Sequence, residues 1–189
     1  MRYFVLMTAV LALAACQQKA QQPSPSNEAA SAPQESGIKG VRRDNKGKPA
    51  PDGEFSNPAG KPAHIADFKG KPVLVNLWAT WCAPCVKELP TLDALARSGR
   101  VQVLAVSQDD APHASVVAFL QAHHIATLEP YQDAKMNLSG ALGADTVLPT
   151  SILIGSDGKE VWRYVGDLDW TSPEAAKLLS EAGGAAKQG

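Results

Sequence analysis

Nearly continuous apolar runs and helix-like stretches alternate along residues 51–185. The runs Pro72–Ala79 (PVLVNLWA) and Val101–Val106 (VQVLAV) are typical of strands that a parallel sheet buries on both faces. Between these runs, Ala83–Arg97 predicts a helix. Because parallel neighbouring strands need a crossover connection, this order predicts a right-handed strand–helix–strand unit.

Two later apolar runs predict a hairpin. Thr150–Gly155 and Glu160–Val165 flank Ser156–Lys159, whose sequence Ser-Asp-Gly-Lys is that of a turn. The other predicted helices run from a cap at Asp109 or Asp110 with Pro112 to about His124, from Lys135 to Leu142 before Gly143, and from Ser172-Pro173-Glu174 to about Gly183-Gly184. Together these elements predict an α/β fold: a central mixed sheet with helices on both faces.

The first fifteen residues (1–15) have the pattern of a lipoprotein signal peptide. Arg2 precedes an apolar stretch, Phe4–Ala15, which is shorter than the roughly 20 residues of a membrane-spanning helix. The exit Leu13–Cys16 (LAAC) resembles the lipobox of bacterial lipoproteins, which implies cleavage before Cys16 and its lipidation. An ordinary signal peptide with a chance cysteine is the alternative. We expect an extracytoplasmic protein anchored to a membrane through lipidated Cys16.

Residues 16–50 are expected to form a lipidated cysteine and a flexible linker before a domain at 51–185. Gln17 to about Gly37 is rich in Gln, Ser, Ala and Pro and has no apolar period. The basic stretch Lys39–Lys48 is interpreted as a solvated linker end, with contact to anionic lipid headgroups as the alternative. The formal net charge is only −1, so no basic excess argues for a nucleic-acid partner.

Candidate chemistry lies where the first buried strand meets its helix, in Trp81–Cys85 (WCAPC). Cys82 and Cys85 are three positions apart in the first helical turn, so they face each other at a spacing that a disulfide accepts. Unpaired backbone N–H groups at a helix N-terminus stabilise a thiolate. Cys82 is therefore predicted to be the exposed nucleophile and Cys85 the shielded resolving thiol. Pro84 suits the first turn, where its missing N–H costs nothing.

Two metal-binding alternatives fit this spacing less well. Half of a zinc site would need two more ligands, and the chain has no second cysteine pair and no finger-like histidine spacing. A copper chaperone is a better rival than a zinc site, but such proteins carry CxxxC with a downstream His, whereas the spacing here is CxxC. We therefore predict a redox-active Cys82–Cys85 disulfide with no metal and no cofactor.

A second motif, Val147–Thr150 (VLPT), stands before the predicted hairpin. With it, residues 70–82 (GKPVLVNLWATWC) and 87–90 (KELP) resemble the TlpA/ResA-like branch of extracytoplasmic thioredoxins. The resemblance covers roughly Pro51 to Ala182, and Asp169-Trp170 makes it closest to TlpA. It implies a thioredoxin-like fold and thiol:disulfide oxidoreductase activity.

The resemblance also implies roles for individual residues. Pro149 is expected in the cis form, packed against the cysteines, with neighbouring backbone free to pair with an incoming peptide. A proline that merely begins a strand is the alternative. The residues expected to contact substrate are Trp81, Ala83, Pro84 and Leu148.

Two polar residues stand in apolar surroundings. Asn76 interrupts the first buried strand where cytoplasmic thioredoxins carry a buried Asp, and an amide cannot titrate. On an ideal helix Glu88 lies at about 240° and Cys85 at about 300° from Cys82, so Glu88 is predicted to share their buried stripe. A buried carboxyl group exchanges protons with a neighbouring thiol, and the resemblance implies the same role. A partly exposed Glu favoured by the helix dipole is the alternative.

The residues between the cysteines indicate the direction of electron flow. A His there would favour a strong oxidant, but Ala83 and Pro84 occupy these positions. We therefore expect a reductant of partner-protein disulfides that a membrane electron donor keeps reduced. The resemblance suggests cytochrome c maturation or assembly of an oxidase copper site. The alternatives are a copper-binding metallochaperone and a peroxide-detoxifying thioredoxin-like enzyme.

Overall fold

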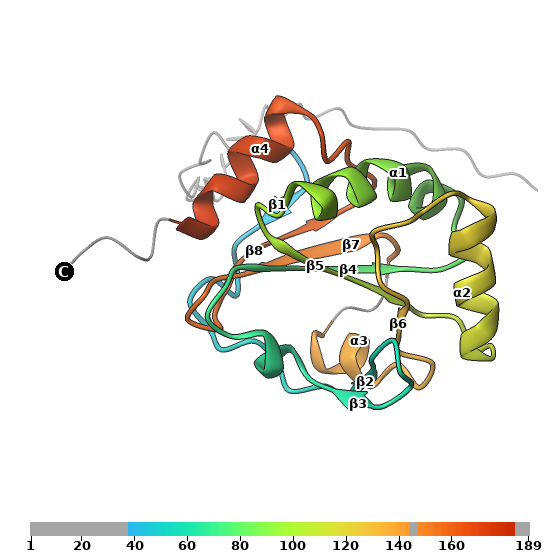
Figure 1. The fold of residues 1–189 in the computed structure, drawn as a ribbon. Coiled ribbons are helices and arrows are strands. Elements are labelled where there is room, and N and C mark those ends of the chain that lie inside the picture. Colours follow the sequence, from blue (N-terminus) through green and yellow to red (C-terminus); the bar gives the residue numbers. More distant parts are fainter. Residues whose placement is uncertain (1–37, 144–146, 184–189) are drawn as a thin grey trace, which may run out of the picture. The chain divides into compact units, whose positions relative to one another are not determined.

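The computed structural model describes residues 38–143 and 147–183. In these residues eight strands form one mixed sheet in the order β1-β8-β7-β4-β5-β6-β2-β3, with helices on both faces (Figure 1). The predicted α/β architecture is confirmed. The predicted signal peptide and Cys16 lie outside the described residues.

The predicted strand–helix–strand unit forms the centre of the sheet. All six residues of β4 (Val73–Trp78) are buried, as its continuous apolar sequence requires. α1 (Ala83–Ser98) connects β4 to β5 (Gln102–Ser107), which runs parallel to it. On its other side β4 pairs antiparallel with β7 (Thr150–Ile154).

The predicted hairpin and closing helix follow. β7 pairs antiparallel with β8 (Glu160–Val165), and Gly158 in the connecting turn has φ 78°, a left-handed conformation that glycine adopts without a steric penalty. α4 (Pro173–Ser180) begins where the sequence places it. Its N-cap is Ser172, whose Oγ accepts a hydrogen bond from the Ala175 N–H at 3.1 Å.

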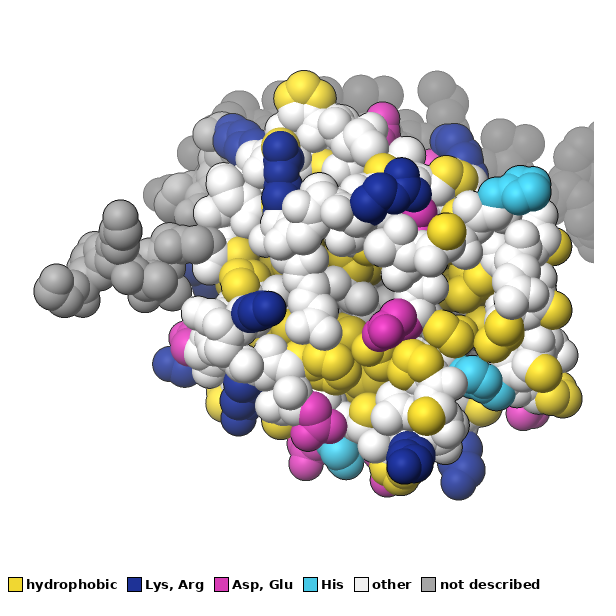
Figure 2. All heavy atoms as spheres, in the orientation of Figure 1, with side chains coloured by type: hydrophobic (Ala, Val, Ile, Leu, Met, Phe, Trp, Pro, Cys, Tyr) yellow, Lys and Arg dark blue, Asp and Glu magenta, His cyan; other side chains and the backbone are white. Residues whose placement is uncertain are grey.

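Side chains of β4 alternate between two cores. Leu74 and Trp78 pack in one core with α1, α2 (His113–Ala122) and α4, whereas Leu77 packs in the other with α3 (Asn137–Ala141). Burying each side chain of this size contributes about 1.5–3 kcal/mol. Figure 2 shows hydrophobic side chains in a band across the middle of one face, at the level of the sheet.

Short strands form both margins of the sheet. β1 (Val41–Arg42) pairs antiparallel with β8 at one margin. At the other margin β6 (Tyr131–Gln132) is followed by β2 (Phe55–Ser56) and β3 (Pro62–Ala63). Each of these four strands is two residues long.

The position of β1 corrects the predicted linker, which ends too late at residue 50. β1 belongs to the sheet, and Pro49 forms an isolated bridge with Lys159. Val41 packs against the core, and Nη2 of Arg43 lies 2.7 Å from Oε1 of Glu181. Apolar packing and an ion pair therefore fix the basic stretch to the folded domain. The charged sequence of this stretch gives no indication of either contact.

The start of α2 corrects a second prediction. The helix begins at His113, and its N-cap Pro112 offers no side-chain hydrogen bond. Asp109 does not cap this helix, because its carboxylate accepts hydrogen bonds from Thr80 and Ser107 instead. Thr80 lies 29 residues before Asp109 in the chain, so the local sequence gives no sign of this donor.

The remaining helices are short. α3 is followed by Gly143 in a left-handed conformation, as predicted. Of two 3-10 helices, η1 (Ile65–Phe68) lies between β3 and β4, and η2 (Glu181–Gly183) directly follows α4. Within residues 38–143 and 147–183 no helix is long and apolar enough to cross a membrane.

Candidate active site

The cysteine pair lies at the N-terminus of α1, directly after the short segment that connects β4 to this helix. Cys82 is the N-cap residue and Cys85 lies in the first turn. The two sulfurs form a disulfide, with the Cα atoms 5.2 Å apart, and Sγ of Cys82 accepts a hydrogen bond from the Cys85 N–H at 3.3 Å. Pro84 occupies the first turn, as predicted. The local geometry matches the predicted redox pair.

Solvent exposure distinguishes the two cysteines less sharply than predicted. Cys82 is 7% exposed in this disulfide state, and Cys85 is fully buried. Cys82 is thus the sulfur nearer to solvent, although it is not an exposed residue. Trp81, directly before it, is 72% exposed, and Ala83 and Pro84 are also exposed. The surface around Cys82 is therefore open to a partner.

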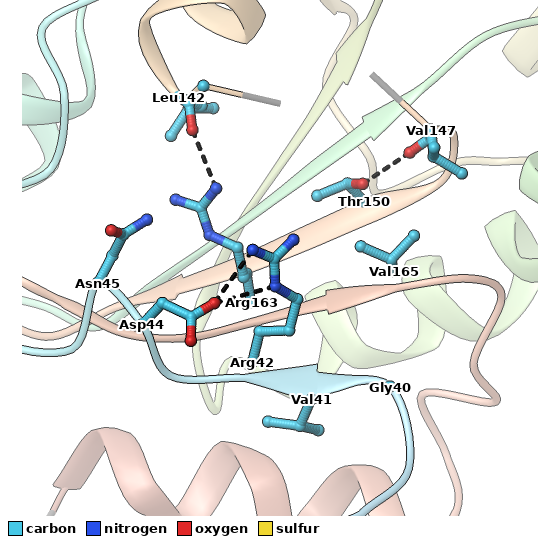
Figure 3. A pocket seen from close by; sticks show the side chains of 11 residues that line it. Gly40, Val41, Arg42, Asp44, Asn45, Leu142, Val147, Thr150, Arg163 and Val165 are labelled. Carbon is cyan, nitrogen blue, oxygen red and sulfur yellow. Dashed lines mark hydrogen bonds and ion pairs between the residues drawn. The ribbon is translucent and has the colours of Figure 1, made fainter. Parts of the chain in front are cut away.

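The second motif lies at the same end of the sheet. The Leu148–Pro149 peptide bond is cis, as the family resemblance implies. Thr150 pairs with Leu77 of β4, so this bond lies at the end of β4 from which the chain continues to Cys82. Thr150 Oγ1 donates a hydrogen bond to the Val147 carbonyl at 2.6 Å, which closes the turn around Pro149 (Figure 3).

A cavity of about 740 Å³ adjoins this turn, between β1, β8 and the end of α3 (Figure 3). Val147 and Thr150 are among its lining residues, as is the buried Arg163. The Arg163 guanidinium binds both carboxylate oxygens of Glu160 at 2.8 and 2.7 Å and donates to the Leu142 carbonyl at 2.9 Å. These bonds tie the end of α3 to β8, so Arg163 has a structural role.

Glu88 is buried on the same side of α1 as Cys85, one helical turn away, so the partly exposed alternative is wrong. Its Oε1 accepts a hydrogen bond from Asn76 Nδ2 at 2.7 Å. Its Oε2 accepts from the Leu168 N–H at 3.1 Å and from Trp170 Nε1 at 3.3 Å. Three donors from distant parts of the chain therefore converge on one carboxyl group.

The surroundings of Glu88 shift the pKa of its carboxyl group toward neutral pH. Burial raises the pKa of Glu88 to about 7, although the hydrogen bonds from Asn76, Leu168 and Trp170 act in the opposite direction. A carboxyl group with this pKa can accept or release a proton at neutral pH. Asn76 itself cannot titrate; it also donates to Ser151 Oγ at 3.0 Å and so fixes the Glu88 side chain to two strands.

The contacts of Glu88 with the segment after β8 were not predicted from the sequence. Asp169-Trp170 contributes to the family resemblance, and the local sequence gives no indication that Leu168 or Trp170 donates to Glu88. The segment is also held by Trp170 N–H, which donates to Thr91 Oγ1 at 3.2 Å. Trp170 is 3% exposed, so its indole is part of the buried environment of Glu88.

Replacing Trp170 by Phe should move the pH dependence of disulfide exchange upward. The indole N–H stabilises the ionised form of Glu88, so its loss raises the pKa of that carboxyl further. The midpoint of the rate against pH, measured by stopped-flow fluorescence, reports this shift.

Trp162→Phe is the matched control for this variant. Trp162 is fully buried, and its Nε1 donates to the Leu178 carbonyl at 3.1 Å, so the control also loses one buried indole hydrogen bond. It should leave the midpoint in place. A midpoint unmoved in Trp170→Phe, or moved equally in both variants, would contradict the assignment.

A cysteine pair at the start of the helix after the central strand, with a cis-proline before the antiparallel strand at the same end of the sheet, defines the thioredoxin-like class of thiol:disulfide oxidoreductases. The chain belongs to the Redoxin family, whose model matches residues 45–179.

Known proteins agree with this assignment. Thiol-disulfide oxidoreductase ResA of Bacillus thuringiensis (strain Al Hakam) is 34% identical over 124 residues, covering 64% of this chain and 70% of that protein. Thiol:disulfide interchange protein DsbE of Pseudomonas fluorescens biotype C is 36% identical over 126 residues, covering 62% and 67%. The exposed lipoprotein thioredoxin Etrx1 of Streptococcus pneumoniae strain TIGR4 is similar in structure, with a TM-score of 0.56, 26% identity and coverage of 69% and 97%. The resemblance to the TlpA/ResA-like branch is confirmed.

The side chains that could bind a metal are dispersed. In the part of the chain that the structure describes, no group of three or more His, Cys, Asp or Glu residues is placed to hold a metal ion. The two cysteines of the motif are joined to each other. The arrangement is suited to dithiol–disulfide exchange.

Proposed function

We propose that this thiol:disulfide oxidoreductase works as a reductant of disulfides in partner proteins. The observation that carries the proposal is Cys82 at the N-cap of α1 with only Ala83 and Pro84 before Cys85. The helix N-terminus favours a thiolate at Cys82, and no His between the cysteines adds to this effect. A moderately stabilised thiolate corresponds to a reducing pair and not to a strong oxidant.

The proposed cycle uses both cysteines. The Cys82 thiolate attacks one sulfur of a partner disulfide, forms a mixed disulfide and releases the other partner sulfur as a thiolate. The Cys85 thiolate then attacks Cys82 Sγ, which releases the second partner sulfur and forms the Cys82–Cys85 disulfide. Glu88 accepts the proton of the Cys85 thiol. A membrane electron donor returns two electrons to the disulfide, and the proton held by Glu88 returns to Cys85, which restores the Cys82 thiolate and the Cys85 thiol.

The proposed substrates are disulfides of apocytochrome c or of the copper site of an oxidase assembly protein, as the family resemblance implies. The exposed Trp81, together with Ala83, Pro84 and Leu148, would contact the partner, whose backbone pairs beside Pro149. A signal peptide at 1–15 and lipidation of Cys16 would hold the protein on the extracytoplasmic side of a membrane. The relative from Streptococcus pneumoniae is an exposed lipoprotein, which supports this location.

The reduction potential of the purified protein tests the proposed direction. Equilibration with defined ratios of a thiol and its disulfide, followed by alkylation of free thiols, should give a potential closer to about −270 mV than to about −120 mV. A value near about −120 mV would make the protein an oxidant. Stoichiometric copper binding that blocks exchange would favour the metallochaperone alternative.

A further inference from the structure

The carboxylate of Asp109 lies between the ends of β4 and β5, and it is 5% exposed. Its Oδ2 accepts hydrogen bonds from the Thr80 N–H at 3.0 Å and from Ser107 Oγ at 2.7 Å, and its Oδ1 accepts from Thr80 Oγ1 at 2.7 Å. Three donors from two residues, Thr80 and Ser107, thus converge on a group that the sequence places in a helix cap.

The loop that carries Asp109 is itself fixed. Gln132 Nε2 donates to the Asp109 carbonyl at 2.8 Å and to the Ala111 carbonyl at 2.7 Å. Gln132 belongs to β6 and is buried. The Gln108 N–H donates to the Trp78 carbonyl at 2.8 Å, which joins the same loop to β4. Asp109 therefore presents its carboxylate from a rigid support.

Thr80 is the link between Asp109 and the reactive sulfur. It stands two residues before Cys82 and directly before Trp81, in the segment between β4 and α1. Trp81 is 72% exposed, so packing against the core does little to hold it. Apart from the turn in which the Cys82 N–H donates to the Ala79 carbonyl at 3.1 Å, Asp109 makes the hydrogen bonds that fix this segment at Thr80.

We propose that Asp109 is a positioning residue for substrate docking: acting through Thr80, it holds Trp81 and Cys82 in the arrangement that a disulfide-bearing polypeptide binds. The inference rests on the proposed function, in which partner proteins contact Trp81. A loop that is already fixed in its bound conformation loses less conformational entropy on docking. Fixing the loop through Asp109 therefore raises the affinity for a polypeptide. A small disulfide, which needs only the sulfur of Cys82, gains little from it.

Asp109→Asn tests the proposal, because an amide has one acceptor oxygen where three donors converge. Reduction of insulin by the variant should show a KM raised about tenfold, which corresponds to about 1.4 kcal/mol. The rate with the small disulfide dithiobis(nitrobenzoate) should stay within about twofold of the wild-type rate. An unchanged KM for insulin, or equal losses with both substrates, would overturn the proposal.

Thr80→Val provides a second, milder variant that removes one hydroxyl and keeps the backbone N–H. It should raise the KM for insulin in the same direction, and the double variant should be no worse than Asp109→Asn alone, because the two residues act as one unit. Additive effects of the two substitutions would overturn the proposed link through Thr80.

Asp93→Asn is the matched control. Asp93 is also a buried carboxylate, and its Oδ1 accepts hydrogen bonds from the Thr127 and Leu128 N–H groups at 2.6 and 2.9 Å. These two donors lie in the loop before β6 and not in the segment that carries Trp81. The control should lower thermal stability and leave the KM for insulin unchanged; an equal rise in KM would overturn the proposal. The reduction potential of the wild type tests the proposed function separately. A wild type that oxidises partners would refute the proposed function, while the comparison of insulin with dithiobis(nitrobenzoate) in Asp109→Asn would still test the role of Asp109.

Discussion

Cys82→Ser should lose disulfide exchange entirely, whereas Cys85→Ser should accumulate a covalent complex with its partner. Cys82 is the sulfur nearer to solvent and lies at the helix N-cap, so its removal leaves no thiolate to attack a partner disulfide. In Cys85→Ser the first attack still occurs, but no second thiol releases the product. Insulin turbidity measures the exchange, and non-reducing electrophoresis measures the complex.

The same two variants identify the physiological partner. Cys85→Ser expressed in the native cell should trap mixed disulfides in the membrane fraction, and mass spectrometry then names the proteins. The double variant Cys82→Ser/Cys85→Ser is the background control, since it can form no such bond. Exchange activity retained in Cys82→Ser, or complexes trapped equally by the double variant, would refute the assigned order of attack.

Glu88→Gln should lower the exchange rate at neutral pH by roughly a hundredfold, the lower end of the range for general acid–base catalysis. In the wild type the rate should rise as pH passes through about 7, because the ionised Glu88 accepts the proton of the Cys85 thiol. The variant should lack this inflection. Stopped-flow fluorescence across the neutral range measures both effects.

Glutamine suits this test because a neighbouring side chain can accept a hydrogen bond from its new NH₂ group. Asn76 Oδ1 has no hydrogen-bond partner among the described residues, so a flip of the Asn76 amide would turn this acceptor toward the new NH₂ group. Glu54→Gln is the matched control, since Glu54 is exposed. An inflection near pH 7 that persists in Glu88→Gln would assign it to another group.

Unfolding provides an independent readout of the same carboxyl group. The pKa of Glu88 is higher in the folded protein, so the folded state binds more protons and loses stability as pH rises from about 4.5 to about 7. Across this window the wild type should lose about 3 kcal/mol relative to Glu88→Gln. Below the window the difference should be constant, and urea unfolding at several pH values measures it.

The elements that the sequence predicts well are those with a strong local pattern. β4 and the helix after it are found where expected, because the pattern of apolar residues in the local sequence predicts their burial. β1 is two residues long, stands in a basic stretch and owes its place to Val41 and to pairing with β8. Such a short strand depends on contacts far along the chain, which local periodicity does not contain.

The candidate site shows the same division. The cysteine spacing and the orientation of Glu88 follow from one helix, so periodicity is enough to predict them. The role of Asp109 was missed because an acidic residue shortly before a helix looks the same whether it caps that helix or binds Thr80. Trp170 was missed as a donor because its partner lies 82 residues away.

The two-residue margins of the sheet offer little backbone for edge-to-edge pairing with another sheet. One margin carries Arg42 and the other carries Pro62, which has no N–H to offer. Edges this short and interrupted are poor templates for a strand from another copy, so they oppose aggregation. In the proposed function, a partner polypeptide would instead pair its backbone with the segment beside Pro149.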